Sequence, residues 1–187
     1  MQFTNIYARY GEIKIVRTWI IAVGLCIFCV IVPLQGFIIG NGYGVGIQGA
    51  MIRYQVTPWG NSVFPLPEEL QFVASGLYSG KSAFMVIFWT IGTIILSMTT
   101  LFSLLYWNQL PQEYLRYIVA GITGAGILYL ASCIAQYGPL FHGPAGISLP
   151  IGVLILFLFA VFLHVHQDFL YSEETFSRYF FPEGTDI

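Results

Sequence analysis

The stretch at residues 83–107, AFMVIFWTIGTIILSMTTLFSLLYW, contains no charged side chain. A helix of about 20 apolar residues is long enough to cross the ~30 Å hydrocarbon layer of a membrane. Three further apolar runs lie at residues 18–39, 117–134 and 147–164. We therefore predict an all-α membrane protein: a four-transmembrane-helix bundle with a small β-rich extracytoplasmic loop between helices 1 and 2.

Composition supports a membrane protein. The chain of 187 residues is 57% hydrophobic and 9% charged, with a mean hydropathy of +0.75. A soluble globular domain carries about 25% charged residues. The four runs use most of the length, so we expect a single integral membrane domain over residues 1–187. The formal net charge of −2 provides no basic surface, and nucleic acid is not an expected partner.

The positive charges predict an orientation in the membrane. Lysine and arginine resist translocation, so they accumulate on the cytoplasmic side. We predict a multi-pass protein of the cell membrane with both termini in the cytoplasm, an interfacial segment at residues 1–17 and a cytoplasmic tail at residues 165–187. Five basic residues lie in segments that we assign to the cytoplasmic side: Arg9, Lys14, Arg17, Arg116 and Arg178. The opposite side has two, Arg53 and Lys81.

The outer loop at residues 40–82 has a pattern of its own. Residues 48–57 alternate between two faces, with Ile52, Tyr54 and Val56 on one of them, which predicts a half-buried strand. A second alternation at residues 70–74 indicates another strand, and Glu68 and Glu69 are expected to be solvated. We expect a small antiparallel sheet that caps the outer ends of the helices.

The same loop contains Trp59-Gly60-Asn61. Four predicted spans, a β-rich first outer loop and a short second one together resemble the claudin-like topology in outline. That family's pattern pairs a tryptophan-containing motif with two loop cysteines, and this loop has none. The resemblance is one of layout, and it implies no function or site residue here.

Two sets of residues are candidates for helix packing or for lining a pore. Hydroxyl side chains recur on one face of the second span, and two small residues lie four positions apart in the third. Hydroxyl and small side chains let membrane helices approach closely and form hydrogen bonds across their interface. The residues are Thr90, Thr93, Ser97, Thr100, Gly121 and Ala125.

A metal site is a further alternative at the end of the fourth span. His164, His166 and Asp168 carry suitable ligand atoms, but on a helix the two histidines lie about 200° apart, so they need an extended backbone to share one metal. A haem held by two histidines is not expected, because His142 and His164 fall at opposite ends of the predicted bilayer. We expect no cofactor.

Catalytic groups are not recognisable in the chain. The cores of the predicted spans lack the charged residues that usually mark ion and proton pathways. Cys26, Cys29 and Cys133 all fall in predicted spans, where a cysteine behaves as a small apolar residue. We therefore expect a small non-catalytic integral membrane subunit that packs within or stabilises a larger membrane protein complex. Its partners would be the lipid bilayer and other membrane subunits or itself.

Two alternatives stay open at this stage. One is a small homo-oligomeric channel or carrier lined by the hydroxyl face of the second span. The other is a metal or redox membrane subunit that uses the segment containing His164 and His166. Each differs from the first hypothesis in what the membrane segments contribute to function.

Overall fold

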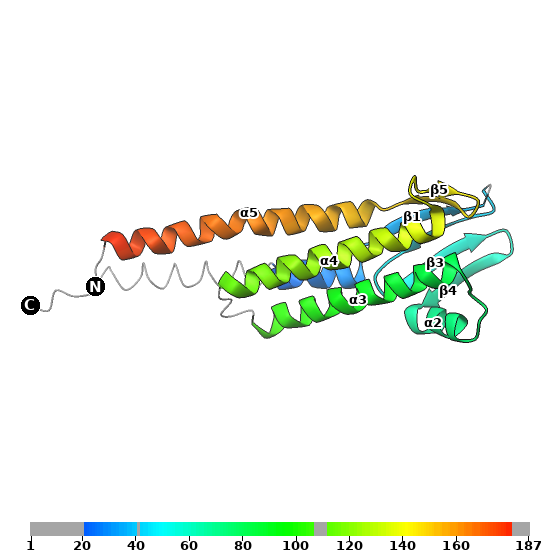
Figure 1. The fold of residues 1–187 in the computed structure, drawn as a ribbon, viewed down its shortest axis with the longest axis horizontal. Helices are drawn as coiled ribbons and strands as arrows, with labels where there is room; N and C mark the ends of the chain where they lie inside the picture. Colours follow the sequence, from blue (N-terminus) through cyan, green and yellow to red (C-terminus); the bar gives the residue numbers. More distant parts are fainter. Residues whose placement is uncertain (1–20, 41, 107–111, 181–187) are drawn as a thin grey trace, which may run out of the picture.

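The computed structural model describes residues 21–40, 42–106 and 112–180; the predicted interfacial segment at 1–17 lies outside them. Within these ranges, six strands form one antiparallel sheet at one end of a group of helices (Figure 1). The prediction of an all-α four-transmembrane-helix bundle is therefore wrong. The sheet that we expected in the first loop is larger than predicted, because strands from the outer end of the first predicted span and from the region of the second loop join it.

The sheet has the order β4-β3-β2-β1-β6-β5. Its first four strands follow one another in the chain, and β6 joins the free side of β1 with Ile38 opposite Ile147. The strands are β1 (Gln35–Ile39), β2 (Gly44–Gln48), β3 (Ile52–Thr57), β4 (Gly60–Pro65), β5 (His142–Gly143) and β6 (Gly146–Leu149).

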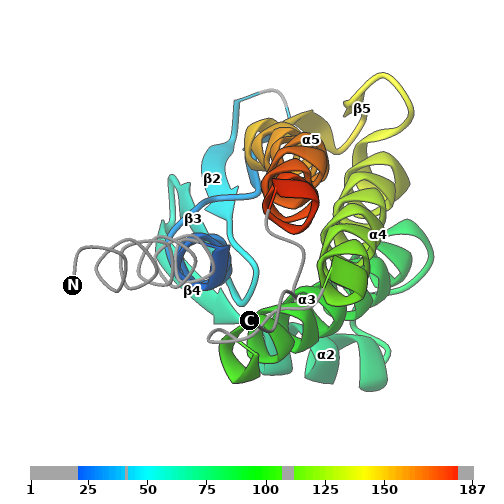
Figure 2. The ribbon, with the colours of Figure 1, turned by 90° about the vertical axis from the view of Figure 1, so that its left-hand side faces the viewer.

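The long helices extend from the sheet toward the other end of the molecule (Figure 1). The elements are a first helix at Ile21–Val30, α2 (Leu66–Ala74), α3 (Lys81–Leu105), α4 (Gln112–Tyr137) and α5 (Ile151–Phe180). Viewed along the long axis, α3, α4 and α5 lie side by side, and β2, β3 and β4 follow one side of the molecule (Figure 2). The buried side chains between the helices form one hydrophobic core, which includes Trp89, Leu96, Ile118, Ile122 and Leu156.

Two described helices are long and apolar enough to cross a membrane, Lys81–Leu105 and Tyr114–Tyr137. The other two apolar helices are shorter within the described residues, at Ile21–Val30 and Ile151–Val165. The predicted span at 18–39 includes β1, and the predicted span at 147–164 begins within β6. Pro33 and Pro150 mark both boundaries, because proline lacks the backbone donor that a continuing helix requires.

The short helix α2 corrects a second prediction. Residues 70–74, which we expected to form a strand, belong to α2, whose first turn contains Pro67 and two acidic residues. Proline is favoured in the first turn of a helix, and acidic side chains there interact well with the helix dipole. Glu69 was expected to be solvated, but it is fully buried. The helix thus turns one carboxylate toward the sheet.

Candidate functional site

A cluster of buried polar side chains lies between the inner face of the sheet and the helices. Gln35 of β1 is at its centre, because its side-chain oxygen accepts hydrogen bonds from the Cys133 thiol and from the Ser148 hydroxyl. Its amide nitrogen donates to the side-chain oxygen of Gln48 on β2. One glutamine therefore joins β1, β2, β6 and α4.

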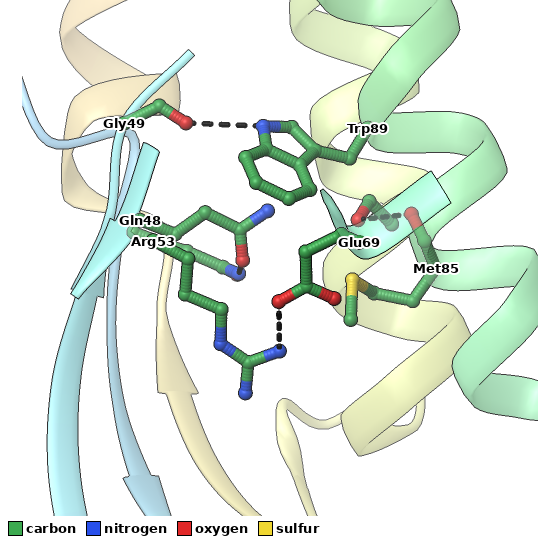
Figure 3. Close-up of polar contacts among 8 residues, drawn as sticks. Gln48, Gly49, Arg53, Glu69, Met85 and Trp89 are labelled. Atoms are coloured by element: carbon green, nitrogen blue, oxygen red, sulfur yellow. Dashed lines mark hydrogen bonds and ion pairs between the residues drawn. The ribbon is translucent and has the colours of Figure 1, made fainter. Parts of the chain in front are cut away.

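The turn between β2 and β3 is bound to α3 next to this cluster. The Trp89 indole N–H donates to the carbonyl oxygen of Gly49 at 3.0 Å, and the Thr93 hydroxyl donates to that of Ala50 at 2.6 Å. Figure 3 shows the indole pointing at Gly49. These two hydrogen bonds give the backbone carbonyls of the turn a partner, and buried polar groups in proteins nearly always have one.

An ion pair links the sheet to α2. Arg53 Nη1 of β3 lies 3.6 Å from Glu69 Oε1, and the side chains are 8% and 0% exposed (Figure 3). Arg53 also lies over the Phe37 ring, with 4.6 Å between its guanidinium carbon and the ring centroid. Burial raises the pKa of Glu69 above the usual glutamate value, and the Arg53 charge opposes that rise. Burial and the Glu69 charge together raise the pKa of Tyr78.

The space inside the cluster is too small for a substrate. A void of about 10 Å³ lies among Gln35, Gln48, Trp89 and Cys133, which is at most the room that one water needs. Cys133 and Ser148 both donate their hydrogen bonds to the side-chain amide oxygen of Gln35. An amide oxygen is not a base that could activate either of them as a nucleophile. The geometry suits a set of contacts that holds sheet and helices together.

The hydroxyl face predicted on the second span lies on α3 and makes mostly local or packing contacts. The Thr93 hydroxyl also contacts the Tyr129 hydroxyl at 3.1 Å, and that of Thr100 donates to the Leu96 carbonyl and contacts the Cys29 sulfur. Thr90 donates to the Val86 carbonyl within its own helix. Ser97 is partly exposed. Thr93 and Thr100 are thus buried in protein contacts.

The small residues predicted on the third span lie on α4, in its contact with α3. A Cβ atom added at Gly121 would lie 2.2 Å from Thr99 Oγ1, and the Ala125 carbonyl would lie 3.4 Å from a Cβ at Gly92. Ala125 is fully buried. The two helices meet through these residues, and Thr99 on α3 is a contact residue that the sequence pattern missed.

The histidine segment lies near the middle of α5, away from the sheet. His164 is exposed on α5 and lines an open groove of about 580 Å³ with Arg116 and Thr123 of α4. The backbone of α5 is helical through Phe180, so the extended backbone that a shared metal would need at residues 164–166 is not observed. The side chains of His166 and Asp168 lie outside the described residues. Among those described, no group of three His, Cys, Asp or Glu could hold a metal ion.

Sequence reasoning missed the buried polar cluster almost entirely. Only the alternation in residues 48–57 hinted at it, because that pattern places Arg53 opposite the apolar face of its strand. Comparisons of the chain with protein-family models, with curated proteins and with solved structures found no match. The function must therefore be argued from the residues and their geometry.

Proposed function

We propose that this chain is a small non-catalytic integral membrane subunit that packs within or stabilises a larger membrane protein complex. The observation that carries the proposal is the apolar surface of its helices. On α3, exposed apolar side chains recur every three or four residues at Ile87, Ile91, Ile94, Met98 and Leu101. A continuous stripe of this kind is unfavourable in water and is suited to lipid or to another apolar helix.

The buried polar cluster supports the same proposal. Its members, centred on Gln35, are occupied by contacts between the chain's own elements, and the void among them is at most the size of a water molecule. These residues therefore fit a role in positioning the sheet on the helices. The remaining surfaces that could carry function are faces suited to contact with other molecules.

We further propose a multi-pass arrangement in the cell membrane with the sheet outside and both termini in the cytoplasm. Strands from both outer loops share one sheet, since β1 pairs with β6. The two loops must then lie on the same side of any membrane that α3 and α4 cross. Arg116, at the end of α4 away from the sheet, agrees with a cytoplasmic location of that end.

Native purification tests the subunit proposal. The chain is isolated from its own membrane in a mild detergent, and co-migrating proteins are identified and quantified by mass spectrometry. We expect other membrane proteins at a fixed stoichiometry. A chain that purifies without any other protein, alone or as copies of itself, would refute a role within a larger complex.

Glycosylation mapping tests the orientation. Tyr43→Thr, at an exposed turn of the sheet, makes Asn41-Gly42 part of an N-x-T acceptor that is modified only on the lumenal side of microsomes. We expect the variant to gain one glycan, and we expect an acceptor appended after Ile187 to remain unmodified. The opposite pattern would show that the orientation is inverted.

The channel alternative has no specific observation in its favour. The Thr93 and Thr100 hydroxyls, which would line the path, are engaged with Ala50, Tyr129, Leu96 and Cys29. A water-filled path would require groups that face an open space. We therefore propose the packing subunit alone.

A further inference from the structure

The sheet has its polarity reversed. An antiparallel sheet with one solvated face usually places apolar residues inside and polar residues outside. Here the buried inner face contains Gln35, Gln48, Arg53 and Ser148, all less than 9% exposed. Most of the neighbouring positions on the same strands, which point the other way, are apolar and exposed. The exposed side of this sheet therefore has the composition of a protein interior.

The outer face is continuous across five strands. Val45 lies opposite both Ile38 and Val56, and Tyr54 lies opposite both Ile47 and Val63. Residues directly opposite each other share one face of a sheet. The register also places Gly36, Asn61, Pro65 and His142 on this face, toward its edges or between larger side chains. Its large apolar residues are Ile38, Val45, Ile47, Ile52, Tyr54, Val56, Val63, Ile147 and Leu149, each exposed by between 36% and 56%.

The size of this face is unusual for a free surface. At these exposures, the nine side chains present on the order of 800 Å², whereas the largest apolar patch of a typical monomer is about 300–600 Å². None of the nine is charged, and Arg53, the basic residue of β3, points to the inner side toward Glu69. Water is a poor solvent for such a face.

The face lies mostly outside the hydrocarbon layer if α3 crosses a membrane. From Trp89, which is bound to the β2–β3 turn, to its end at Leu105, α3 extends about 24 Å. That length uses most of the ~30 Å of hydrocarbon. From the turn, β2 and β3 run alongside the first turns of α3 and then past its start (Figure 1). Lipid tails are therefore a poor match for most of the outer face.

We propose that the outer face is covered by the outer face of a second copy of this chain, packed sheet against sheet. About 800 Å² from each partner is the size of a standard specific interface. Two pleated apolar faces pack about 10 Å apart with interdigitating side chains. The nine apolar side chains carry no charge that would repel a second copy, and a two-fold axis brings identical surfaces together.

Membrane insertion makes this pairing accessible, and in this respect the inference rests on the proposed function. Two copies in one bilayer have the same orientation, so their sheets lie at the same height. β3 and β4 run in the same direction as the helix axes (Figure 1). The outer face of the sheet is therefore parallel to the membrane normal and points sideways, toward neighbouring molecules in the membrane. A two-fold axis along the membrane normal then places the two faces opposite each other.

The test measures the copy number of the full chain. Fluorescently labelled protein is reconstituted into liposomes at several densities and counted by single-molecule photobleaching. Ile47→Glu introduces a charge at the centre of the face. Val45→Thr, Val56→Thr and Val63→Thr together replace methyl groups by hydroxyls while keeping residues that favour strands. Leu77→Glu and Leu140→Glu are matched controls, because both leucines are well exposed and lie outside the sheet.

We expect the wild-type chain and both controls to form dimers, and both face variants to dimerise at least about tenfold more weakly. Thermal unfolding of each variant shows whether it is folded. A wild-type chain that stays monomeric at all densities would overturn the inference, as would a dimer that both face variants leave unchanged. Copy number does not depend on other proteins, so a homodimer without other subunits refutes the subunit proposal alone.

Discussion

Trp89 of α3 donates its indole N–H to the carbonyl oxygen of Gly49 at 3.0 Å, which fixes the β2–β3 turn to the longest apolar helix that begins beside the sheet. Trp89 is fully buried. This contact determines how far the sheet extends beyond the helices, since the strands on both sides of the turn begin or end there. Its loss should therefore loosen the sheet from the helices.

Trp89→Phe removes the donor and leaves the Gly49 carbonyl oxygen without its partner. We expect the free energy of unfolding to fall by about 1–3 kcal/mol, the cost of a buried unpaired polar group. Thermal unfolding in detergent measures this loss. Trp59→Phe is the control, because Trp59 is 84% exposed and its replacement should change stability by less than about 0.5 kcal/mol. Equal effects at the two sites would contradict the anchoring role.

Gly121→Ala should push α3 and α4 apart, because the added Cβ would lie 2.2 Å from Thr99 Oγ1. We expect a loss of about 1–3 kcal/mol in unfolding free energy, typical of overpacking. Gly124→Ala, three residues along the same helix, meets no atom within 4 Å. It should leave stability unchanged or raise it by up to about 1 kcal/mol, because alanine favours helix. A greater loss at Gly124 would refute the predicted packing.

The raised pKa of Glu69 predicts a dependence of stability on pH. The folded chain holds this proton more tightly than the unfolded chain, whose glutamates have a pKa near 4.5. The resulting stabilisation is complete below that pH and is lost as pH rises through the higher folded pKa. The melting temperature of the wild type should therefore decline as pH rises through this range. Glu69→Gln should remove the part of the decline that comes from Glu69, whereas Glu68→Gln, at the exposed neighbouring residue, should retain it. Parallel pH curves for wild type and Glu69→Gln would contradict the assignment.

Gln35→Leu should destabilise the chain by more than the loss of one hydrogen bond. The substitution leaves the Ser148 hydroxyl, the Cys133 thiol and the Gln48 side-chain oxygen without their partner. Each unpaired buried polar group costs about 1–3 kcal/mol. Gln48→Leu in the same chain removes one of these unpaired groups. In a double-mutant cycle of unfolding free energies, we expect the pair to cost less than the sum of the two single changes. Strict additivity would mean that the cluster is not a connected unit.

Hydropathy located some elements well and misjudged others. The runs around α3 and α4 are long and apolar, and both became helices that could cross a membrane. The apolar residues of β1 and β6, such as Phe37 and Ile147, continued the runs of neighbouring helices, so hydropathy alone placed them in spans. Pro33 and Pro150 held the information about where those helices end or begin, and the prediction gave them too little weight.

The buried side of the sheet was beyond prediction for a different reason. An isolated Arg53 or Glu69 is best solvated, and only the fold shows that they meet from β3 and α2. Likewise, Gln35 and Ser148 are separated by 113 residues, and neither gives a local signal of the other. A pattern within one strand identifies its two faces, but which face is buried depends on partners from distant elements.

The pairing of β1 with β6 has a consequence for biosynthesis. The strand β1 leaves the ribosome early, while β6 follows only after α3, α4 and the second outer loop have been made. Until then, β1 has one unsatisfied hydrogen-bonding edge, and the inner polar cluster lacks Ser148. Assembly of the complete sheet must therefore wait until β6 has been made. A nascent chain stopped before β6 would present an open strand edge to quality-control chaperones.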